Sequence, residues 1–356
     1  MINPFKMFFP RKMVGIDIGT SSIKVVEVSR WGGGKTLENY GEMKSGSLYK
    51  EVSGGTQKGS NVLSSDLIAK TIKGILDEAK IKTKAVIFSI PDFSTFCTSF
   101  DMPAMTEKEI PEAIHYNASQ YITLPISEVT LDWKILPNNP LDKNSSLKVF
   151  LVAIPNQVVQ EYQTLARMAG LTLYAIEAEA LGVSRSLVKN NNKKAVCVID
   201  IGVLSSTINI VDNGFLKKSY SFNFNSNQLM HVISSSLGIS PEQAESIKNN
   251  EGLLHSRQDI VKMLYLLIDP LLVEIKSVCA EFLYAEKKQI EEVYLTGGTA
   301  NLPGLKEYVA ESLKKPIYVT NCFSDFLYSP ILEETLRDMG PRFSASVGVA
   351  LGGLDM

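Results

Sequence analysis

The stretch Val14-Gly15-Ile16-Asp17-Ile18-Gly19-Thr20-Ser21-Ser22-Ile23-Lys24 decides how the first part of this chain folds. β-Branched runs flank the turn at residues 19–22, which predicts a strand, a tight turn and a second strand. Residues 199–202 repeat the order Ile-Asp-Ile-Gly and lead into another hydroxyl-rich turn and strand. The repeat indicates an internal duplication whose period is too long for a solenoid. We therefore expect two related lobes that face each other across a cleft.

The composition limits the class of protein. A chain of 356 residues with 45% apolar side chains can bury a large core and should form two or more domains. Its 36 basic and 38 acidic residues leave a net charge of −2, which argues against a nucleic-acid partner. The four cysteines are far apart and form no CxxC pair, which excludes a disulfide scaffold or a zinc ribbon. These features predict an intracellular protein.

The first twelve residues mix apolar and basic side chains. They lack the apolar stretch and small-residue cleavage site of a signal peptide, and no segment approaches the roughly 20 apolar residues that span a bilayer. A weak contact with a membrane surface is one interpretation, and a frayed or locally packed leader is the favoured alternative.

The repeated turns have the chemistry of a phosphate site. Each Asp-Ile-Gly ends a buried strand where the chain reverses, and the amides of such a turn form an anion-binding concavity. Hydroxyls at residues 20–22 and the ammonium of Lys24 add donors. Asp17 and Asp200 could hold a hydrated Mg²⁺, which usually keeps several waters and takes one or two carboxylates. With Thr-Gly-Gly-Thr at residues 296–299, the pair predicts a cleft for ATP or ADP with Mg²⁺.

These motifs resemble the two phosphate motifs and the adenosine motif of the actin-like ATPase superfamily. Within it the chain is similar to the PilM family of type IV pilus assembly proteins, which are relatives of the cell-division protein FtsA. The similarity runs from about residue 13 to the C-terminus. The segments that carry the narrower resemblance are Ile90-Pro91, MPAMTE at 102–107, QYITLP at 120–125, Asp132 and IEAEAL at 176–181.

The resemblance implies an α/β, actin-like fold with duplicated ribonuclease-H-like lobes and an inserted α+β subdomain, called 1C. The boundaries that we expect are 1–82, 154–194 and 336–356 for the first lobe (1A), 83–153 for 1C, 195–222 and 289–335 for the second lobe (2A), and 223–288 for a helical subdomain (2B). Within 1C, Thr106 and Glu109 form the pattern of a capping box ahead of a helix that reaches about Ile122.

The same resemblance implies roles for individual residues. Asp17 and Asp200 would organise Mg²⁺ through water. The residues implied to hold the phosphates are Gly19, Thr20, Ser21 and Lys24 on one side and Gly202 and Ser206 on the other. Those implied to hold the adenosine are Glu245, Lys248, Gly297, Gly298 and Thr299. Glu245 and Lys248 share a helix face and could instead be an ordinary surface ion pair.

Catalysis is less firmly implied than binding. Glu177 ends a predicted strand where hydrolytic relatives carry a water-positioning Glu or Gln, although it could also be a helix-start charge favoured by the macrodipole. Glu179 is interpreted as an exposed helical carboxylate. Leu204 occupies a position where active members often have a second glycine. We therefore expect ATP binding with slow or negligible hydrolysis.

The resemblance implies a cytoplasmic structural adaptor at the inner membrane. It would bind the N-terminal peptide of a PilN-like membrane protein in a groove between 1A and 1C, and it would connect to the pilus motor ATPases or the platform protein. Self-association is a further expectation. The alternatives are an FtsA- or MreB-like filament-forming ATPase, although the chain lacks the basic amphipathic helix that ends FtsA-like chains, and a sugar kinase, for which no catalytic aspartate is evident in the first lobe.

Overall fold

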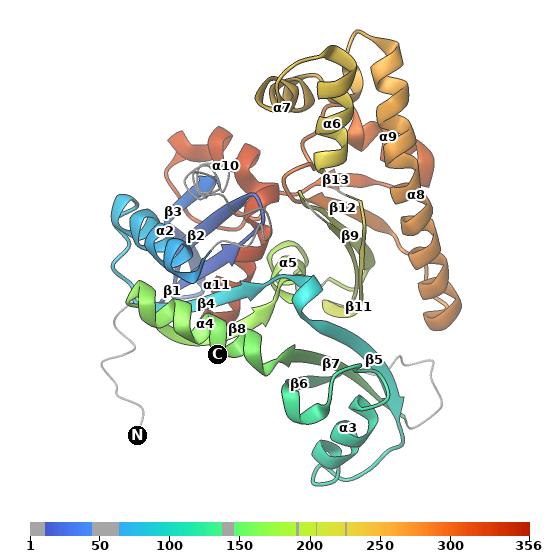
Figure 1. Cartoon of the computed structure of the whole chain (residues 1–356). Coiled ribbons are helices and arrows are strands. Elements are labelled where there is room, and N and C mark those ends of the chain that lie inside the picture. The colour runs from blue at the N-terminus through green and yellow to red at the C-terminus, as the bar shows by residue number, and fades with distance from the viewer. Residues whose placement is uncertain (1–10, 45–63, 137–145, 190–191, 204, 225) are drawn as a thin grey trace.

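The computed structural model describes residues 11–44, 64–136, 146–189, 192–203, 205–224 and 226–356. Figure 1 shows two sheet-containing lobes side by side and a smaller subdomain below them. The sheet of the first lobe has five strands in the order β3-β2-β1-β4-β8. Its strands are β1 (Arg11–Ile18), β2 (Ser22–Trp31), β3 (Gly34–Lys44), β4 (Ala85–Ile90) and β8 (Thr172–Ala178).

The second lobe repeats this sheet. Its strands follow the order β11-β10-β9-β12-β13. They are β9 (Ala195–Ile201), β10 (Ser206–Asp212), β11 (Phe215–Phe222), β12 (Glu292–Thr296) and β13 (Ile317–Val319). In both sheets the first strand pairs antiparallel with the second and parallel with the fourth. The duplication predicted from the two Asp-Ile-Gly turns is therefore confirmed.

Two helices of the first lobe pack tightly together. They are α5 (Glu179–Leu187) and α11 (Ser344–Asp355). Residues 344–354 are all buried, as expected for a helix that is apolar all round. A Cβ atom added at Gly348 would lie 1.7 Å from the carbonyl oxygen of Gly182, so only glycine permits this approach of the two backbones. The first lobe also contains α2 (Ser65–Glu78), α4 (Asn156–Ala169) and α10 (Glu333–Met339).

The inserted subdomain is a three-stranded antiparallel sheet with one α-helix. Its elements are β5 (Phe96–Met102), α3 (Ile110–Ala118), β6 (Val129–Leu136) and β7 (Leu147–Pro155), and the strand order is β5-β7-β6. The helix is shorter than predicted, and Glu109 rather than Thr106 is its N-cap. Of the predicted capping box only one half forms, in which Glu109 Oε2 accepts hydrogen bonds from the backbone and side chain of Thr106.

Two expected domain boundaries are wrong. β4 was assigned to 1C, but it pairs with β1 and β8 and so belongs to the first lobe, which moves the start of 1C from residue 83 to just beyond residue 90. Residues 320–335 were assigned to the second lobe. Phe323 and Phe326 instead pack in the core of the first lobe, and Leu327 N donates to Lys35 O at 2.8 Å. The first lobe therefore resumes near residue 320.

Helices cover the second sheet. They are α6 (Ser226–Leu237), α7 (Pro241–Asn250), α8 (Gln258–Glu286) and α9 (Leu305–Leu313). Their buried side chains share one apolar core with β9, β10 and β12. α8 continues for 29 residues through Pro270. Among the helices of the described ranges, none is long and apolar enough to cross a membrane.

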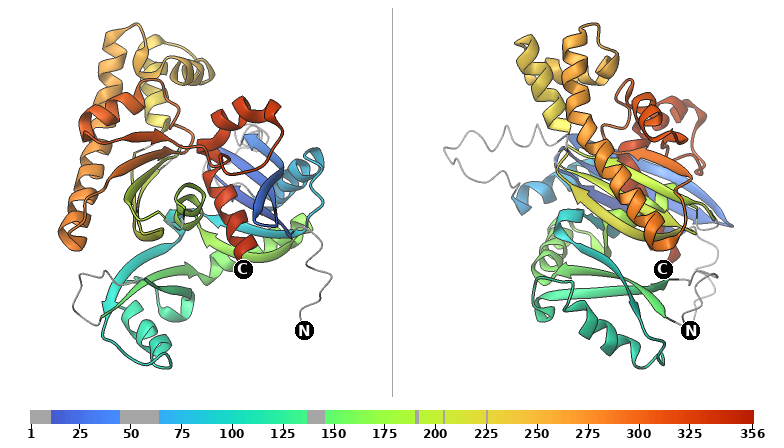
Figure 2. Two further views of the ribbon diagram at one scale, coloured as in Figure 1. Left: turned by 180° about the vertical axis from the view of Figure 1, so that it is seen from behind. Right: turned by 90° about the vertical axis from the view of Figure 1, so that its right-hand side faces the viewer.

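The inserted subdomain contacts both lobes. It leaves the first lobe after β4 and returns into α4, and in Figure 2 it lies beneath both sheets when the molecule is seen from behind. Ser99 Oγ donates to Lys217 O of the second lobe at 2.8 Å. Lys148 forms an ion pair with Glu286 at the end of α8. The subdomain is thus positioned by both lobes, although the chain inserts it into only one.

Candidate functional site

Two matched turns face the space between the lobes. Gly19 N donates to Ser22 O at 3.0 Å, and Gly202 N donates to Ser205 O at the same distance. Each turn joins the first two strands of its sheet. A Cβ atom at Gly202 would lie 2.6 Å from Ser205 O, which explains why glycine occurs there. The sequence repeat is therefore also a repeat of backbone geometry.

A cleft lies between these turns. Residues of both lobes line it, namely Asp17, Gly19, Thr20, Ser21, Ser22, Lys24, Glu42, Pro91, Phe93, Glu179, Asp200, Gly202, Val203, Ser205, Thr207, Gly297, Gly298, Pro341, Arg342 and Ala345. The structure thus brings together nine of the residues predicted from the sequence: Asp17, Gly19, Thr20, Ser21, Lys24, Asp200, Gly202, Gly297 and Gly298.

A buried ion pair forms part of the cleft floor. Lys24 Nζ lies 3.0 Å from Asp17 Oδ2, and both residues are less than 10% exposed. Burial alone would lower the pKa of Lys24. The attraction of Asp17, supported by Glu42 and Glu179, outweighs that effect and keeps the pKa above its ordinary value. Lys24 is therefore a fixed positive charge on the cleft floor, beside several acidic side chains.

Three further carboxyl groups come close to this pair. Burial, with the nearby charges of Asp92 and Asp17, raises the pKa of Asp200 to about 7. Burial and the same acidic neighbours raise the pKa of Glu179 well above its usual range. Burial also raises the pKa of Asp92, although its Oδ1 accepts a hydrogen bond from Ala180 N at 3.1 Å. Such shifts are typical of functional sites, where like charges are held together.

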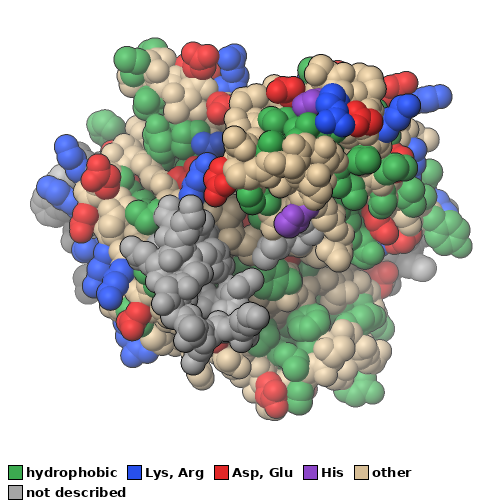
Figure 3. Space-filling model, turned by 45° about the horizontal axis from the view of Figure 1, so that its top comes forward, with side chains coloured by type: hydrophobic (Ala, Val, Ile, Leu, Met, Phe, Trp, Pro, Cys, Tyr) green, Lys and Arg blue, Asp and Glu red, His purple; other side chains and the backbone are tan. Residues whose placement is uncertain are grey.

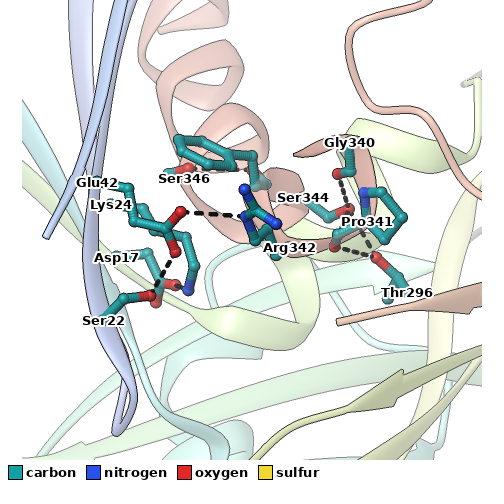
Figure 4. A network of polar contacts seen from close by, with 11 residues as sticks. Asp17, Ser22, Lys24, Glu42, Thr296, Gly340, Pro341, Arg342, Ser344 and Ser346 are labelled. Carbon is teal, nitrogen blue, oxygen red and sulfur yellow. Dashed lines mark hydrogen bonds and ion pairs between the residues drawn. The ribbon is translucent and has the colours of Figure 1, made fainter. Parts of the chain in front are cut away.

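A second polar network closes one side of the cleft. Figure 4 shows Glu42 between Ser22 and Arg342. Ser22 Oγ donates to Glu42 Oε1 at 2.8 Å, and Glu42 Oε2 forms an ion pair with Arg342 Nε at 3.1 Å. Glu42 belongs to β3, whereas Arg342 belongs to the short helix η6 (Gly340–Phe343) just before α11. Two distant parts of the sequence are thereby joined at the cleft.

The predicted adenosine turn is anchored to the same short helix. Gly297 N donates to Pro341 O at 2.9 Å, and Thr296 Oγ1 donates to the same oxygen at 2.7 Å. Gly297 has a φ of 87°, and a Cβ atom there would lie 2.3 Å from Asp200 Oδ1. Thr299 is buried behind the turn rather than in the cleft lining. Only glycine at residue 297 allows this turn to approach the aspartate.

One phosphate-binding assignment needs correction. Ser206 was expected to oppose the first turn. It is 1% exposed and its hydroxyl donates to Phe224 O at 2.8 Å, so it stabilises the start of β10. Ser205 and Thr207, its neighbours on either side, line the cleft instead. The alternation of side chains along the strand explains the difference.

The catalytic candidate Glu177 lies away from the cleft. Both of its carboxylate oxygens accept hydrogen bonds from the guanidinium of Arg185, on the opposite side of the first lobe. Glu179, which was interpreted as an exposed helical carboxylate, lines the cleft at the first turn of α5. The chain passes from β8 to α5 between the two residues, so their side chains point in different directions. Glu179 therefore faces the cleft, where Glu177 was expected, and Glu177 faces away from it.

Glu245 and Lys248 are not among the residues that line the cleft. Lys248 is buried and its Nζ donates to Ser226 Oγ at 2.8 Å, while burial lowers its pKa. Glu245 is exposed. Ser226 N donates to Gly202 O at 3.2 Å, so Lys248 supports the second phosphate turn through one intermediate residue. Its contact with ribose or adenine remains a prediction.

Several cleft residues escaped the sequence analysis. Asp92 does not line the cleft but acts on Asp200 and Glu179 from beside it, and it directly follows the Ile90-Pro91 pair, which could have drawn attention to it. Glu42 and Arg342 reach the site only through tertiary packing, and neither belongs to a recognisable motif. Leu204, from which slow hydrolysis was inferred, lies outside the described residues.

The acidic residues present suit a hydrated magnesium ion. Across the described part of the chain, no group of three or more His, Cys, Asp or Glu side chains could form a protein-only metal site. Magnesium bound with a nucleotide needs only one or two carboxylates, because water and phosphate supply its other ligands. Asp17 and Asp200, one from each lobe, would serve in this way, and the ion would neutralise phosphate charge.

The outer surface carries no comparable concentration of charge on the face drawn in Figure 3, where basic and acidic side chains are interspersed among the coloured residues. This distribution agrees with the net charge of −2.

A family model described as type IV pilus assembly protein PilM matches residues 15–354. The chain belongs to this PilM family. Membership covers both lobes and the inserted subdomain, so the fold and the cleft are features of a pilus assembly protein. The family also agrees with the resemblance inferred from the sequence motifs.

Solved structures show the same actin-like fold. The chain is similar to a protein in a structure titled "PilM-PilN type IV pilus biogenesis complex", with 23% identity, coverage of 96% of this chain and 98% of that chain, and a TM-score of 0.77. It is also similar to the ethanolamine utilization protein EutJ of Carboxydothermus hydrogenoformans, with 16% identity, coverage of 96% of this chain and 90% of that chain, and a TM-score of 0.56. A further match is MreB 5 of Spiroplasma citri bound to AMPPNP, with 15% identity, coverage of 92% of this chain and 97% of that chain, and a TM-score of 0.51.

The cleft generates a prediction about Lys24. We expect Lys24→Ala to weaken ATP binding about tenfold or more, because a charged hydrogen bond contributes roughly 1.5–3 kcal/mol. Lys12→Ala is the matched control, since Lys12 lies on the neighbouring strand β1 of the same sheet but pairs with Glu38 outside the cleft. Isothermal titration calorimetry measures both affinities, with thermal unfolding to confirm that each variant is folded. Equal ATP affinity of a folded Lys24→Ala variant and the natural protein would refute the phosphate assignment.

The raised pKa of Asp200 generates a prediction about stability. Its folded pKa of about 7 exceeds the ordinary 3.8, so the native state binds a proton that the unfolded state has lost between these values. The free energy of unfolding therefore falls as pH rises through this window, and the loss is complete above pH 7. We expect Asp200→Asn to raise the Tm of the ligand-free protein more at pH 8 than at pH 4.5.

Asp259→Asn provides the control for this experiment. The exposed Asp259 pairs with Arg257, and this partner lowers its pKa, so its replacement should give no gain in Tm at pH 8. Differential scanning calorimetry at the two pH values measures the change. A gain for Asp200→Asn that is the same at both pH values would show that the carboxylate is not under electrostatic strain.

Proposed function

We propose that this PilM-family protein is an ATP-binding structural adaptor of type IV pilus assembly. Its partner would be the N-terminal cytoplasmic peptide of a PilN-like inner-membrane protein, which would hold the adaptor at the cytoplasmic face of that membrane. From there it would connect to the cytoplasmic pilus motor or platform protein. The observation that carries this proposal is a second cavity, of about 590 Å³, between the first lobe and the inserted subdomain.

This cavity, here called the groove, has walls from three parts of the molecule. The subdomain contributes Asp132, Trp133, Lys134, Leu136, Phe150 and Val152, and the first lobe contributes Glu177, Leu181, Ser184, Arg185, Gly352, Asp355 and Met356. The second lobe contributes Gly214, Phe215 and Leu216. A cavity of this size, with apolar and polar walls in nearly equal shares, suits several side chains of a short peptide together with its main-chain groups.

The groove also offers groups for a peptide main chain. β6 and β8 both contribute to it, and both are edge strands of their sheets. An extended peptide can add its backbone hydrogen bonds to such an edge while its side chains enter neighbouring pockets. Ser184 Oγ is fully buried and has no hydrogen-bond partner among the residues that the structure describes. A buried hydroxyl without a partner is costly, and a peptide that moves the groove wall enough to reach it would satisfy it.

The cleft supports the nucleotide part of the proposal. The MreB structure to which this chain is similar carries AMPPNP, and here the two glycine turns and Lys24 form a corresponding cradle for phosphates. Glu179 is the carboxylate best placed to orient a water molecule. In the absence of a metal ion, burial and the neighbouring carboxylates raise its pKa and favour the protonated form, which is a poor proton acceptor. We therefore propose that ATP is bound and hydrolysed slowly if at all.

The membrane and motor connections rest on the family. The PilM match favours a pilus adaptor over an FtsA- or MreB-like filament former. Since the described helices include no candidate membrane span, a peptide bound in the groove would supply an attachment to the membrane. The adaptor would then present its other surfaces to cytoplasmic components.

Peptide binding tests the proposal. The probe is a synthetic peptide with the cytoplasmic N-terminal sequence of the PilN-type protein from the same organism, titrated by calorimetry into the full chain. We expect saturable one-to-one binding. Ser184→Ala should weaken it about fivefold, the effect of roughly 1 kcal/mol from one hydrogen bond, without lowering the Tm, because the Ser184 hydroxyl makes no hydrogen bond to the described residues.

Ser186→Ala is the matched control. Ser186 lies on the same helix, but its hydroxyl donates to Val183 O and it does not line the groove. This variant should bind the peptide as the natural protein does. Absence of peptide binding to the natural protein, both with and without ATP, would remove the adaptor function.

A further inference from the structure

Both candidate sites are built from the same two lobes. The cleft has Asp17 and Lys24 on one side and Asp200 and Gly297 on the other. The groove has first-lobe residues of β8, α5 and α11 on one side and residues 214–216 of the second lobe on another. We propose that nucleotide binding in the cleft and peptide binding in the groove are thermodynamically coupled through the relative position of the lobes. This inference rests on the proposed function of the groove.

In the second lobe, a single strand connects the two sites. β10 begins at Ser206, between the cleft residues Ser205 and Thr207, and ends at Asp212. The next residues form the tight turn that brings Phe215 to the groove. Every residue of β10 is buried between its sheet neighbours and the packed core. A displacement of the second lobe at the cleft must therefore also displace the wall at Phe215.

In the first lobe, two helices connect the sites in the same way. α5 starts at Glu179 in the cleft and carries Ser184 and Arg185 in the groove. α11 has Ala345 in the cleft and Gly352 in the groove. These helices are held together where Gly182 and Gly348 meet, and Arg185 also donates to Gly348 O at 2.9 Å. They therefore form one rigid block that borders both sites.

The lobes contact each other along this block. Asp92 Oδ1 accepts from Ala180 N at the start of α5 and also interacts with Thr207 of the second lobe. At the groove, Lys134 Nζ of the subdomain lies 5.0 Å from the ring centroid of Phe215. Side chains of α5 share an apolar cluster with Val196 and Leu216 of the second lobe. The second lobe thus contacts the rest of the molecule near both sites, and the apolar cluster lies along α5 as well.

Coupling follows from this arrangement. A nucleotide that contacts both phosphate turns has a different affinity for each angle between the lobes, and so does a peptide that contacts both Leu181 and Phe215. Two ligands that bias the same equilibrium change each other's affinity by one common factor, typically 5-fold to 150-fold. The nucleotide would therefore regulate how tightly the adaptor holds its membrane partner.

The test is a set of binding measurements on the full chain. The affinity of the PilN-type peptide is measured by calorimetry in the presence of Mg²⁺ alone, Mg²⁺ with ATP and Mg²⁺ with ADP. We expect at least one nucleotide to change the peptide affinity threefold or more. The reciprocal titration of nucleotide, with and without peptide, must give the same factor. Peptide affinities that agree within threefold under all three conditions would overturn the coupling and leave the adaptor function intact.

Two variants locate the coupling. Phe215→Ala removes the second-lobe wall, so the nucleotide effect on peptide affinity should fall to less than twofold. Leu181→Ala is the matched control, because it removes an apolar side chain of the first-lobe wall and should weaken the peptide while keeping the nucleotide effect. Thermal unfolding confirms that both variants are folded. An unchanged nucleotide effect in Phe215→Ala would refute the role of β10, and a failure of the natural protein to bind peptide would instead remove the function on which the inference rests.

Discussion

The structure depends on holding acidic side chains together where the two sheets meet. Asp17 and Asp200 end equivalent strands of the two lobes, and Lys24 is the cation paired with one of them. Asp92 and Glu179 add to the same field, and the consequence is the raised pKa of Asp200 and Glu179. A folded protein keeps such an arrangement at a cost in stability, which a positively charged or magnesium-associated ligand would relieve.

The backbone turns around these carboxyl groups approach one another so closely that they leave no room for a side chain at two glycines. Gly297 lets the turn at residues 296–299, the predicted adenosine turn, approach Asp200, and Gly202 lets the turn at residues 202–205, the second predicted phosphate turn, close on itself. Pro341, just before the long buried helix α11, accepts hydrogen bonds from the adenosine turn. The charged floor therefore lies where the two lobes meet, and a ligand bound there would contact both of them.

Much of this could be predicted from the sequence, for physical reasons. The conformation of each strand-turn-strand unit depends mainly on residues that are close together in the sequence. The duplicated sheets and nine residues of the cleft could therefore be predicted from local pattern and resemblance. Glu177 and Glu179 show the limit, because which carboxylate faces the cleft depends on where β8 ends and α5 begins, to within one residue. The prediction that Ser206 lines the cleft is wrong for a similar reason, since side chains alternate along the strand and its neighbours Ser205 and Thr207 line the cleft instead. Arg342 and the groove arise only from tertiary packing, which no local pattern records.

The central claim is that one molecule presents a nucleotide cleft and a peptide groove on opposite sides of α5. Hydrogen–deuterium exchange of the full chain, with and without the PilN-type peptide, tests it most directly. The account predicts that the peptide protects amides in residues 131–136, 181–187 and 213–217, which belong to the three walls of the groove. Protection confined to other segments, with these three unchanged, would contradict it.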